Sequence, residues 1–330
     1  MKHAFIVSAC KKYIPELTAL LNSLEMVGNK HDVFVIAYEL PEELIAQFST
    51  LSFHVETYRI PEAEAREFGG ESEILCRKRY WYAAEWGKNY DSVCILDADM
   101  IVVRPLDLFL EIAAKTGIIL GVSLEQKTTY GTDEDGHAHQ RVLGEHMVKT
   151  PTWNPKDMCC TPCFVSARDY ESQLKKSWEI FTLGYPDNNF KAPDQQAFNM
   201  ILVAEGLTNR VILLPNMCWV GSNEKLLKPY TRFTVQGDGL IWTESGEPVF
   251  VLHGQFYKAR WRQGQLEARH GCAEGYLGYS KKTDDMAAGA MNGLYEWFRK
   301  CLNYKIRCDD TKAYTASGHP SKLVPMEDIV

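Results

Sequence analysis

The sequence has no hydrophobic run long enough to span a lipid bilayer, which takes about 20 consecutive apolar residues. It also lacks the pattern of a secretory signal. Met1-Lys2-His3 leads into only a short apolar stretch before Lys11, and no small-residue cleavage site follows. We therefore expect a cytoplasmic protein without a membrane span.

Cysteine is too sparse for a disulfide scaffold, with 10 cysteines among 330 residues. In the absence of a secretory signal, we expect these cysteines as reduced thiols. Cys159, Cys160 and Cys163 lie close together, but a second ligand pair at zinc-finger spacing is missing. Buried thiols are therefore favoured over a metal knuckle.

Positive charge is not in excess, since 36 Lys and Arg residues face 43 Asp and Glu residues for a net charge of -7. This balance argues against a broad nucleic-acid-binding face, although it leaves room for a local basic cleft. Hydrophobic residues make up 45% of the chain, which excludes a disordered protein. The length fits one large α/β domain or two smaller ones, and no internal repeat is present.

Strand and helix signals alternate along the first 123 residues. Short apolar runs predict strands at Ala4–Ala9, Val33–Ala37, Phe53–Tyr58, Ser92–Leu96 and Gly117–Ser123. Helical spacing and helix-opening prolines predict helices at Leu17–Leu24, from Pro41, at Glu71–Tyr90 and from Pro105. This alternation is typical of a mostly parallel sheet flanked by helices, in which ligands bind at the carboxyl ends of the strands.

The second half is less regular. Glu125–Asp157 is polar and contains His137, His139 and His146, so we interpret it as a long loop or lid rather than a second metal site. Turn signals within Phe233–Val251 predict small antiparallel additions. Further elements are predicted at Thr161–Ala167, Asp169–Leu183, Asp194–Glu205, Arg210–Leu214 and Met286–Ile306.

Two carboxylates, Asp97 and Asp99, follow the apolar run Ser92–Leu96 at the predicted end of a central strand. An Asp-X-Asp sequence is common in solvated turns, so by itself it is a weak signal. Here apolar residues flank it on both sides, and burying two carboxylates is costly unless a cation compensates. We therefore predict that Asp97 and Asp99 hold a divalent cation against a phosphorylated ligand.

His253 ends a second apolar run and is followed by Lys258 and Trp261. A neutral imidazole with two carboxylates is a ligand set that suits Mn²⁺ as well as Zn²⁺. Lys258 would neutralise a phosphate that the metal shares. The alternative interpretation is a hydrogen-bonded histidine at a strand end and a surface lysine.

Other polar side chains lie near the predicted strand ends. Asp194 opens a predicted helix, where an N-cap is the ordinary role, but capping does not explain Gln195 beside it. Ser8 and Tyr13 follow the first strand, where the tyrosine would either stack on a base or belong to the core.

Arg77, Lys78 and Arg79 precede the strand that ends at Asp97. Such a triplet is ordinarily a solvated face, although one of the three could turn inward to a phosphate. Together with the carboxylates and the histidine, these cations describe a metal–diphosphate site.

Three motifs occur in order: a hydrophobic strand with D-x-D at Tyr90–Val103, a D-Q-x-x-x-N helix at Pro193–Asn199, and a His…Lys…Trp stretch at His253–Trp261. On these motifs the sequence resembles the retaining glycosyltransferases of family 8, of the glycogenin and lipopolysaccharide galactosyltransferase type, which have a GT-A fold. The likeness covers most of the chain, from about residue 5 to residue 261. It implies an α/β fold with a Rossmann-like, mostly parallel central sheet and small antiparallel additions in the C-terminal half.

The resemblance implies a role for each matching residue at the metal and the sugar. Asp97, Asp99 and His253 would bind Mn²⁺, with Mg²⁺ as the alternative ion. Asp194 would contact sugar hydroxyls. Gln195 would lie beside the anomeric carbon, where the family has a debated nucleophile or ion-stabilising group.

Donor binding is implied in the same way. Ser8 and Tyr13 match family residues near the uracil ring. Arg77 matches a basic residue that contacts the donor diphosphate or sugar, with Lys78 as the alternative. Lys258 would hold the β-phosphate.

The sequence departs from the family pattern at two places. The C-terminal motif has no proline before Trp261, and its Lys258 is one residue closer to His253, so Arg260 is an alternative cation. Thr161-Pro162-Cys163 stands where the family has a sugar-contacting Asn-Ser/Ala-Gly strand, which leaves the identity of the sugar open.

The domain organisation follows from the resemblance. It implies a GT-A domain over residues 1–262, with a nucleotide-binding half to about residue 123 and an acceptor and metal half beyond it. A helical extension and tail would occupy residues 263–330. The aromatic and basic helix of that extension is expected to pack on the domain, with contact to a membrane surface as the alternative.

The implied activity is metal-dependent transfer of a hexose or pentose from a nucleotide-diphosphate sugar, UDP-linked in this family type, to a hydroxyl acceptor. The acceptor would be a glycan, a protein or a lipid-linked molecule. A sugar nucleotidyltransferase is one alternative, but its usual glycine-rich loop is missing from Ser8–Tyr13. A catalytically inactive GT-A scaffold is the other, and the intact set of Asp97, Asp99, Gln195 and His253 counts against it.

Overall fold

The computed structural model describes residues 1–67, 78–123, 159–184, 193–214, 218–220, 233–235, 241–243, 248–253, 301 and 304–308. Its centre is a seven-stranded sheet with the strand order β3-β2-β1-β4-β7-β6-β8. The strands are β1 (His3–Cys10), β2 (Asp32–Tyr38), β3 (Val55–Arg59), β4 (Ser92–Asp97), β6 (Ile119–Ser123), β7 (Cys159–Val165) and β8 (Val211–Leu213).

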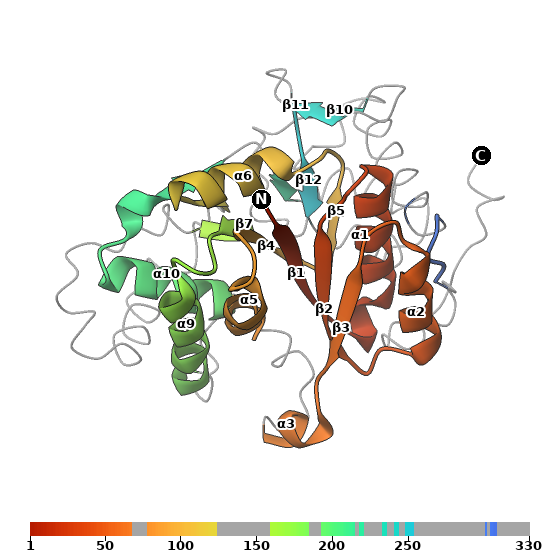
Figure 1. The fold of residues 1–330 in the computed structure, drawn as a ribbon, viewed down its shortest axis with the longest axis horizontal. Helices are drawn as coiled ribbons and strands as arrows, with labels where there is room; N and C mark the ends of the chain where they lie inside the picture. The colour runs from red at the N-terminus through yellow and green to blue at the C-terminus, as the bar shows by residue number, and fades with distance from the viewer. Residues whose placement is uncertain are drawn as a thin grey trace, which may run out of the picture.

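Helices cover both faces of this sheet, as Figure 1 shows. Along the fully buried β1, Phe5 and Val7 point into one core while Ala4 and Ile6 point into the other, as the two-residue repeat of a strand requires. The first core also contains residues of α1 (Ile14–Met26), α2 (Glu42–Gln47) and α6 (Asp107–Thr116). The second contains residues of α5 (Arg79–Gly87), α9 (Glu171–Gly184) and α10 (Pro193–Ala204).

The strand directions confirm the predicted, mostly parallel sheet. β1, β2, β3 and β4 are all parallel, and β6 is parallel to β8. β7 runs antiparallel to both of its neighbours, β4 and β6. In the parallel register Ser8 lies opposite Asp97, so β1 and β4 end side by side at the same edge.

Three short strands form a second sheet beside this edge. They are β5 (Met100–Val102), β9 (Cys218–Val220) and β12 (Val251–His253), in the order β5-β12-β9. β12 is antiparallel to β5 and parallel to β9. A separate antiparallel pair joins β10 (Phe233–Val235) to β11 (Ile241–Thr243), which confirms the antiparallel additions predicted in this half.

Within the described residues, the helix predicted at Glu71–Tyr90 is shorter than predicted on both sides. Among the described residues α5 covers Arg79–Gly87, and Lys78 has non-helical backbone angles. The helix ends at Gly87 because the next residues form a turn, in which the Tyr90 N–H donates to the Gly87 carbonyl at 2.9 Å. This turn returns the chain to the start of β4.

Other helix starts differ from prediction by one to three residues. α6 begins at Asp107, two residues after Pro105. α10 begins at Pro193, a residue suited to the first helical position because its missing N–H needs no partner there. Asp194 therefore lies inside the first turn and is not the N-cap that the sequence suggested.

The described part of the C-terminal extension, Tyr304–Cys308 with Cys301, is fastened to α1. The buried amide of Asn22 donates to the carbonyl of Ile306 at 2.7 Å and accepts from the N–H of Ile306 at 2.9 Å and of Lys305 at 3.2 Å. Ile306 is fully buried in the first core. Since Tyr304–Ile306 are bends, the predicted helix Met286–Ile306 does not reach its predicted end; most of it lies outside the described residues.

Replacing Asn22 by alanine is expected to lower the free energy of unfolding by about 2–4 kcal/mol, because several buried backbone groups lose their partner at once. Urea unfolding measures the change. Asn89→Ala, at an exposed turn position, is the control and should change stability little. Equal stabilities for the two variants would mean that this attachment contributes nothing.

A second stability prediction concerns His3, at the other end of β1. Burial, followed by the nearby His31, lowers the pKa of His3 below its usual value of 6.5. The unfolded chain therefore takes up a proton below pH 6.5 that the folded protein resists, so stability falls as the pH drops through this window. Urea unfolding at several pH values should show a smaller acid loss for His3→Gln than for the wild type.

Candidate active site

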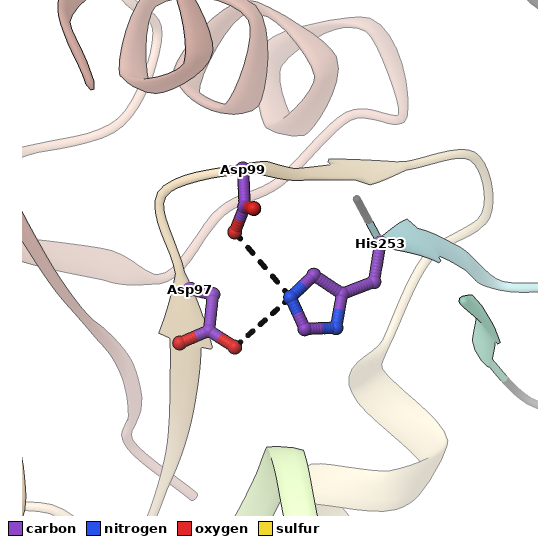
Figure 2. A group of neighbouring side chains, drawn as sticks. All are labelled: Asp97, Asp99 and His253. Atoms are coloured by element: carbon purple, nitrogen blue, oxygen red, sulfur yellow. Dashed lines mark ion pairs between the residues drawn. The ribbon is translucent and has the colours of Figure 1, made fainter. Parts of the chain in front are cut away.

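Asp97, Asp99 and His253 converge where the two sheets meet (Figure 2). Asp97 is the last residue of β4, and Asp99 lies in the turn that leads into β5. The antiparallel register of β12 with β5 places His253 opposite Met100, the residue after Asp99. The pairing of two segments some 150 residues apart thus brings the predicted histidine to the predicted carboxylates.

The geometry of these three side chains suits a divalent cation. The Nε2 atom of His253 lies 3.1 Å from Asp97 Oδ2 and 3.3 Å from Asp99 Oδ1. One ligand atom from each residue lies within 4.8 Å of the others. No other group of three or more His, Cys, Asp or Glu residues within the described ranges has such an arrangement. Carboxylate oxygens with one imidazole nitrogen are ligands that Mn²⁺ accepts.

Arg79 ties this group to the start of α10. Its Nη1 donates to Asp97 Oδ1, and its Nε donates to Asp194 Oδ2 at 2.7 Å. The side chain of Arg79 is 4% exposed and that of Asp194 only 2%. Arg79 is the first residue of α5 and shares a face with Ala83 and Gly87, which packs on β1 and β4, so its guanidinium points toward the strand end.

From the sequence, Arg79 is only one of three candidate cations, and the resemblance points to Arg77 with Lys78 as the alternative. The Lys78 ammonium pairs with Glu64 at 2.7 Å and lies 4.6 Å from the centre of the Trp81 ring. The structure therefore does not bring Lys78 to the carboxylates. Arg77 lies outside the described residues. The small-residue face of α5 was the available signal for Arg79, because it marks which residues of this helix face the sheet.

Carboxylates gather in the described part of the site. Asp97, Asp99 and Asp194 lie there with the guanidinium of Arg79 and the imidazole of His253. All are largely buried, with side-chain exposures from 2% to 17%. Burying carboxylates is costly unless positive charge compensates them. A cation between Asp97, Asp99 and His253 fits this arrangement.

Gln195 is connected to the same carboxylate through Thr161. The Gln195 Nε2 donates to Thr161 Oγ1 at 2.9 Å, and Thr161 Oγ1 donates to Asp97 Oδ2. Asn199, one turn further along α10, bonds both backbone groups of Cys159 in β7, each at 2.7 Å. These two bonds fix α10 against β7 and explain what the asparagine of the D-Q-x-x-x-N stretch does here.

Of the two residues predicted to bind the nucleotide, Ser8 lies next to this group in the fold. Ser8 is buried and sits level with Asp97 in the neighbouring strand. Tyr13 ends a short 3-10 helix after β1 and packs partly buried against the first core. Lys258, Arg260 and Trp261, from the C-terminal motif, and the lid segment Glu125–Asp157 with its histidines lie outside the described residues.

The cysteines near the site are buried thiols, as predicted. Cys159, Cys160 and Cys163 all lie in β7 with at most 1% exposure. The Sγ atoms of Cys159 and Cys163 are 3.9 Å apart, and this contact together with burial raises the pKa of Cys159.

No helix in the part of the chain that the structure describes has the length and apolar character needed to cross a bilayer. No protein-family model and no curated protein sequence matches the chain.

Solved structures do match it. The apo structure of the bifunctional glycosyltransferase WbbM is similar with a TM-score of 0.56 and 12% identity, over 96% of this chain and 51% of that one. The galactosyltransferase LgtC in complex with donor and acceptor sugar analogs is similar with a TM-score of 0.53 and 13% identity, over 87% of this chain and 99% of that one. An active-site mutant of LgtC is similar with a TM-score of 0.52 and 13% identity, over 76% of this chain and 87% of that one.

The chain thus spans about half the length of the WbbM chain and nearly the whole length of LgtC. At these identities the likeness is one of fold. The mostly parallel seven-stranded sheet, helices on both faces and the small sheets beside it together form the GT-A fold of glycosyltransferases.

Proposed function

We propose that the protein is a glycosyltransferase that moves a hexose or pentose from a UDP-linked sugar to a hydroxyl acceptor, using Mn²⁺ and retaining the anomeric configuration. The observation that supports this most directly is the Asp97, Asp99 and His253 group at the carboxyl edge of a GT-A sheet. Ligands of open α/β sheets bind at this edge. LgtC, which has the same fold, is described with donor and acceptor sugar analogs.

Asp97, Asp99 and His253 would hold the ion, with Mg²⁺ as the alternative metal. When bound, Mn²⁺ supplies positive charge that stabilises the diphosphate leaving group. Ser8 and Tyr13 would hold the nucleotide beside it, because Ser8 lies near the end of β1, the strand next to β4, and Tyr13 follows that strand.

Arg79 is proposed as the cation that positions the carboxylates of Asp97 and Asp194. It holds Asp97 toward the metal position and Asp194 toward the sugar, and its own charge lies beside both. Arg77 and Lys258, with Arg260 as the alternative, are proposed from the sequence as further contacts to the donor phosphates.

The chemical step that fits this arrangement needs no separate general base. The acceptor oxygen bonds to the anomeric carbon on the side from which the diphosphate leaves, and the broken C–O bond gives its electron pair to the diphosphate. The acceptor proton passes to the departing phosphate oxygen. Gln195 would stabilise the positive charge that develops at the anomeric carbon, and Asp194 would contact the sugar hydroxyls.

The test is incubation of the pure protein with UDP-glucose, UDP-galactose and other nucleotide sugars, with Mn²⁺ or with EDTA. We expect slow Mn²⁺-dependent release of UDP from one donor, measured by chromatography. Pyrophosphate release would indicate a nucleotidyltransferase instead. Absence of both turnover and calorimetric donor binding would overturn the proposal.

A further inference from the structure

Thr161 stands between the proposed metal site and the proposed reacting centre. Its hydroxyl contacts Asp97 Oδ2 on one side and Gln195 Nε2, at 2.9 Å, on the other. Thr161 belongs to β7, Asp97 to β4 and Gln195 to α10, so three elements meet at one oxygen atom. The threonine is 1% exposed, which keeps water away from both bonds.

The direction of each bond follows from the chemistry of the groups. A carboxylate can only accept, so the single hydroxyl hydrogen of Thr161 is donated to Asp97. The same oxygen can then only accept from Gln195, and of the two ends of an amide only the nitrogen donates. The negative charge of Asp97 thus determines, through Thr161, that the carbonyl oxygen of Gln195 points away from β7.

That carbonyl oxygen is ready for a ligand. Gln195 Oε1 is buried and has no hydrogen-bond partner among the described residues. Leaving a buried acceptor unpaired is costly, so such an atom calls for a functional explanation. The Asn199 bonds to Cys159 hold α10 in place, so Gln195 cannot relieve this by moving with its helix.

We propose that Thr161 is a positioning residue that presents the Gln195 carbonyl oxygen, and not its amide nitrogen, to the carbon that develops positive charge. An oxygen stabilises that charge, whereas an N–H group would repel it. That a carbon develops positive charge beside Gln195 rests on the proposed glycosyl transfer. The orientation of the Gln195 amide does not depend on it. Because the orientation depends on the Asp97 carboxylate, the metal site and the reacting centre are coupled through one hydroxyl.

The matched variants are Thr161→Val, which keeps the shape and removes the hydroxyl, and Thr161→Ser, which keeps the hydroxyl and removes a methyl group. At saturating Mn²⁺ we expect Thr161→Val to lower kcat about 10–100-fold with little change in the donor KM. Thr161→Ser should restore most of kcat. A packing defect would instead follow side-chain volume, so the unfolding temperature and kcat would both be lowered in Thr161→Ser and not in Thr161→Val.

A double-mutant cycle tests whether Thr161 acts through Gln195. We expect Thr161→Val to cause little further loss of kcat in a Gln195→Ala background, because the group that it orients is gone. Fully additive losses would show that Thr161 acts by another route and would overturn the proposal.

A readout independent of turnover separates this inference from the proposed function. In protein labelled with ¹⁵N-glutamine, the side-chain NH₂ signals of Gln195 are identified by their loss in Gln195→Glu. We expect slow hydrogen exchange of one proton in the wild type and in Thr161→Ser, and fast exchange in Thr161→Val. Equal exchange in all three would overturn the inference even if the protein transfers sugar. The expected pattern without any turnover would uphold the amide orientation while the proposed function fails.

Discussion

Asp99→Asn is expected to abolish Mn²⁺-dependent turnover, with a loss of about 10³-fold or more. The substitution keeps the shape of the side chain but replaces a charged ligand by a neutral one, at a group whose ligand atoms lie within 4.8 Å of one another. A hard divalent cation depends on carboxylate charge for its affinity. Steady-state UDP release as a function of Mn²⁺ concentration measures the effect.

Asp99→Asn should also differ from the wild type in how Mn²⁺ changes its thermal stability. We expect Mn²⁺ to bind only the folded wild type, so it should raise the unfolding temperature of the wild type and leave that of Asp99→Asn nearly unchanged. Glu111→Gln is the matched control, because this carboxylate lies on the exposed side of α6, paired with Lys115. Near-wild-type activity of Asp99→Asn would remove Asp99 from the metal site.

The predictable part of the fold is the part in which local pattern and burial agree. The apolar runs that predict β1, β2 and β4 lie inside the sheet with helices on both faces, so their composition and their environment match. β7 was found from its residues, but its antiparallel direction was not. Direction depends on how the chain returns from the preceding segment, which no local pattern records.

The site divides in the same way. Asp97 and Asp99 could be placed because they follow a recognisable strand, and His253 because it ends a second one. The resemblance sets Thr161 where the family has a sugar-contacting strand, but its contacts with Asp97 and Gln195 could not be predicted. They depend on the pairing of β7 with β4 and on the docking of α10. Among three consecutive basic residues, only the starting point and phase of α5 decide which one faces the sheet.

Whether Arg79 or Lys78 is the inward-facing cation can be tested directly. Arg79→Met is expected to lower the free energy of unfolding of the metal-free protein by about 3–5 kcal/mol, since it leaves Asp97 and Asp194 buried without their cation. Lys78→Met changes the adjacent residue in the same way. It removes a partly buried pairing with Glu64, in which each side chain is 17% exposed, and a contact with Trp81. Because Glu64 still accepts from the Tyr82 hydroxyl at 3.2 Å, we expect a smaller loss, about 1–2 kcal/mol.

A change at Asp194, the second carboxylate bound by Arg79, tests the same account independently. In Arg79→Met/Asp194→Asn, one of the two carboxylates that lost the Arg79 guanidinium is replaced by a neutral amide, so we expect part of the lost stability to return. Activity should not return with it, because Asp97 still lacks the guanidinium that fixes its Oδ1 and the sugar contact at residue 194 is altered. Urea unfolding of the wild type and the three variants, followed by UDP release at saturating Mn²⁺, measures both effects. A larger loss of stability for Lys78→Met than for Arg79→Met would show that Arg79 is not the inward-facing cation. It would also contradict the account in which the Arg79 guanidinium stabilises the buried carboxylates of Asp97 and Asp194.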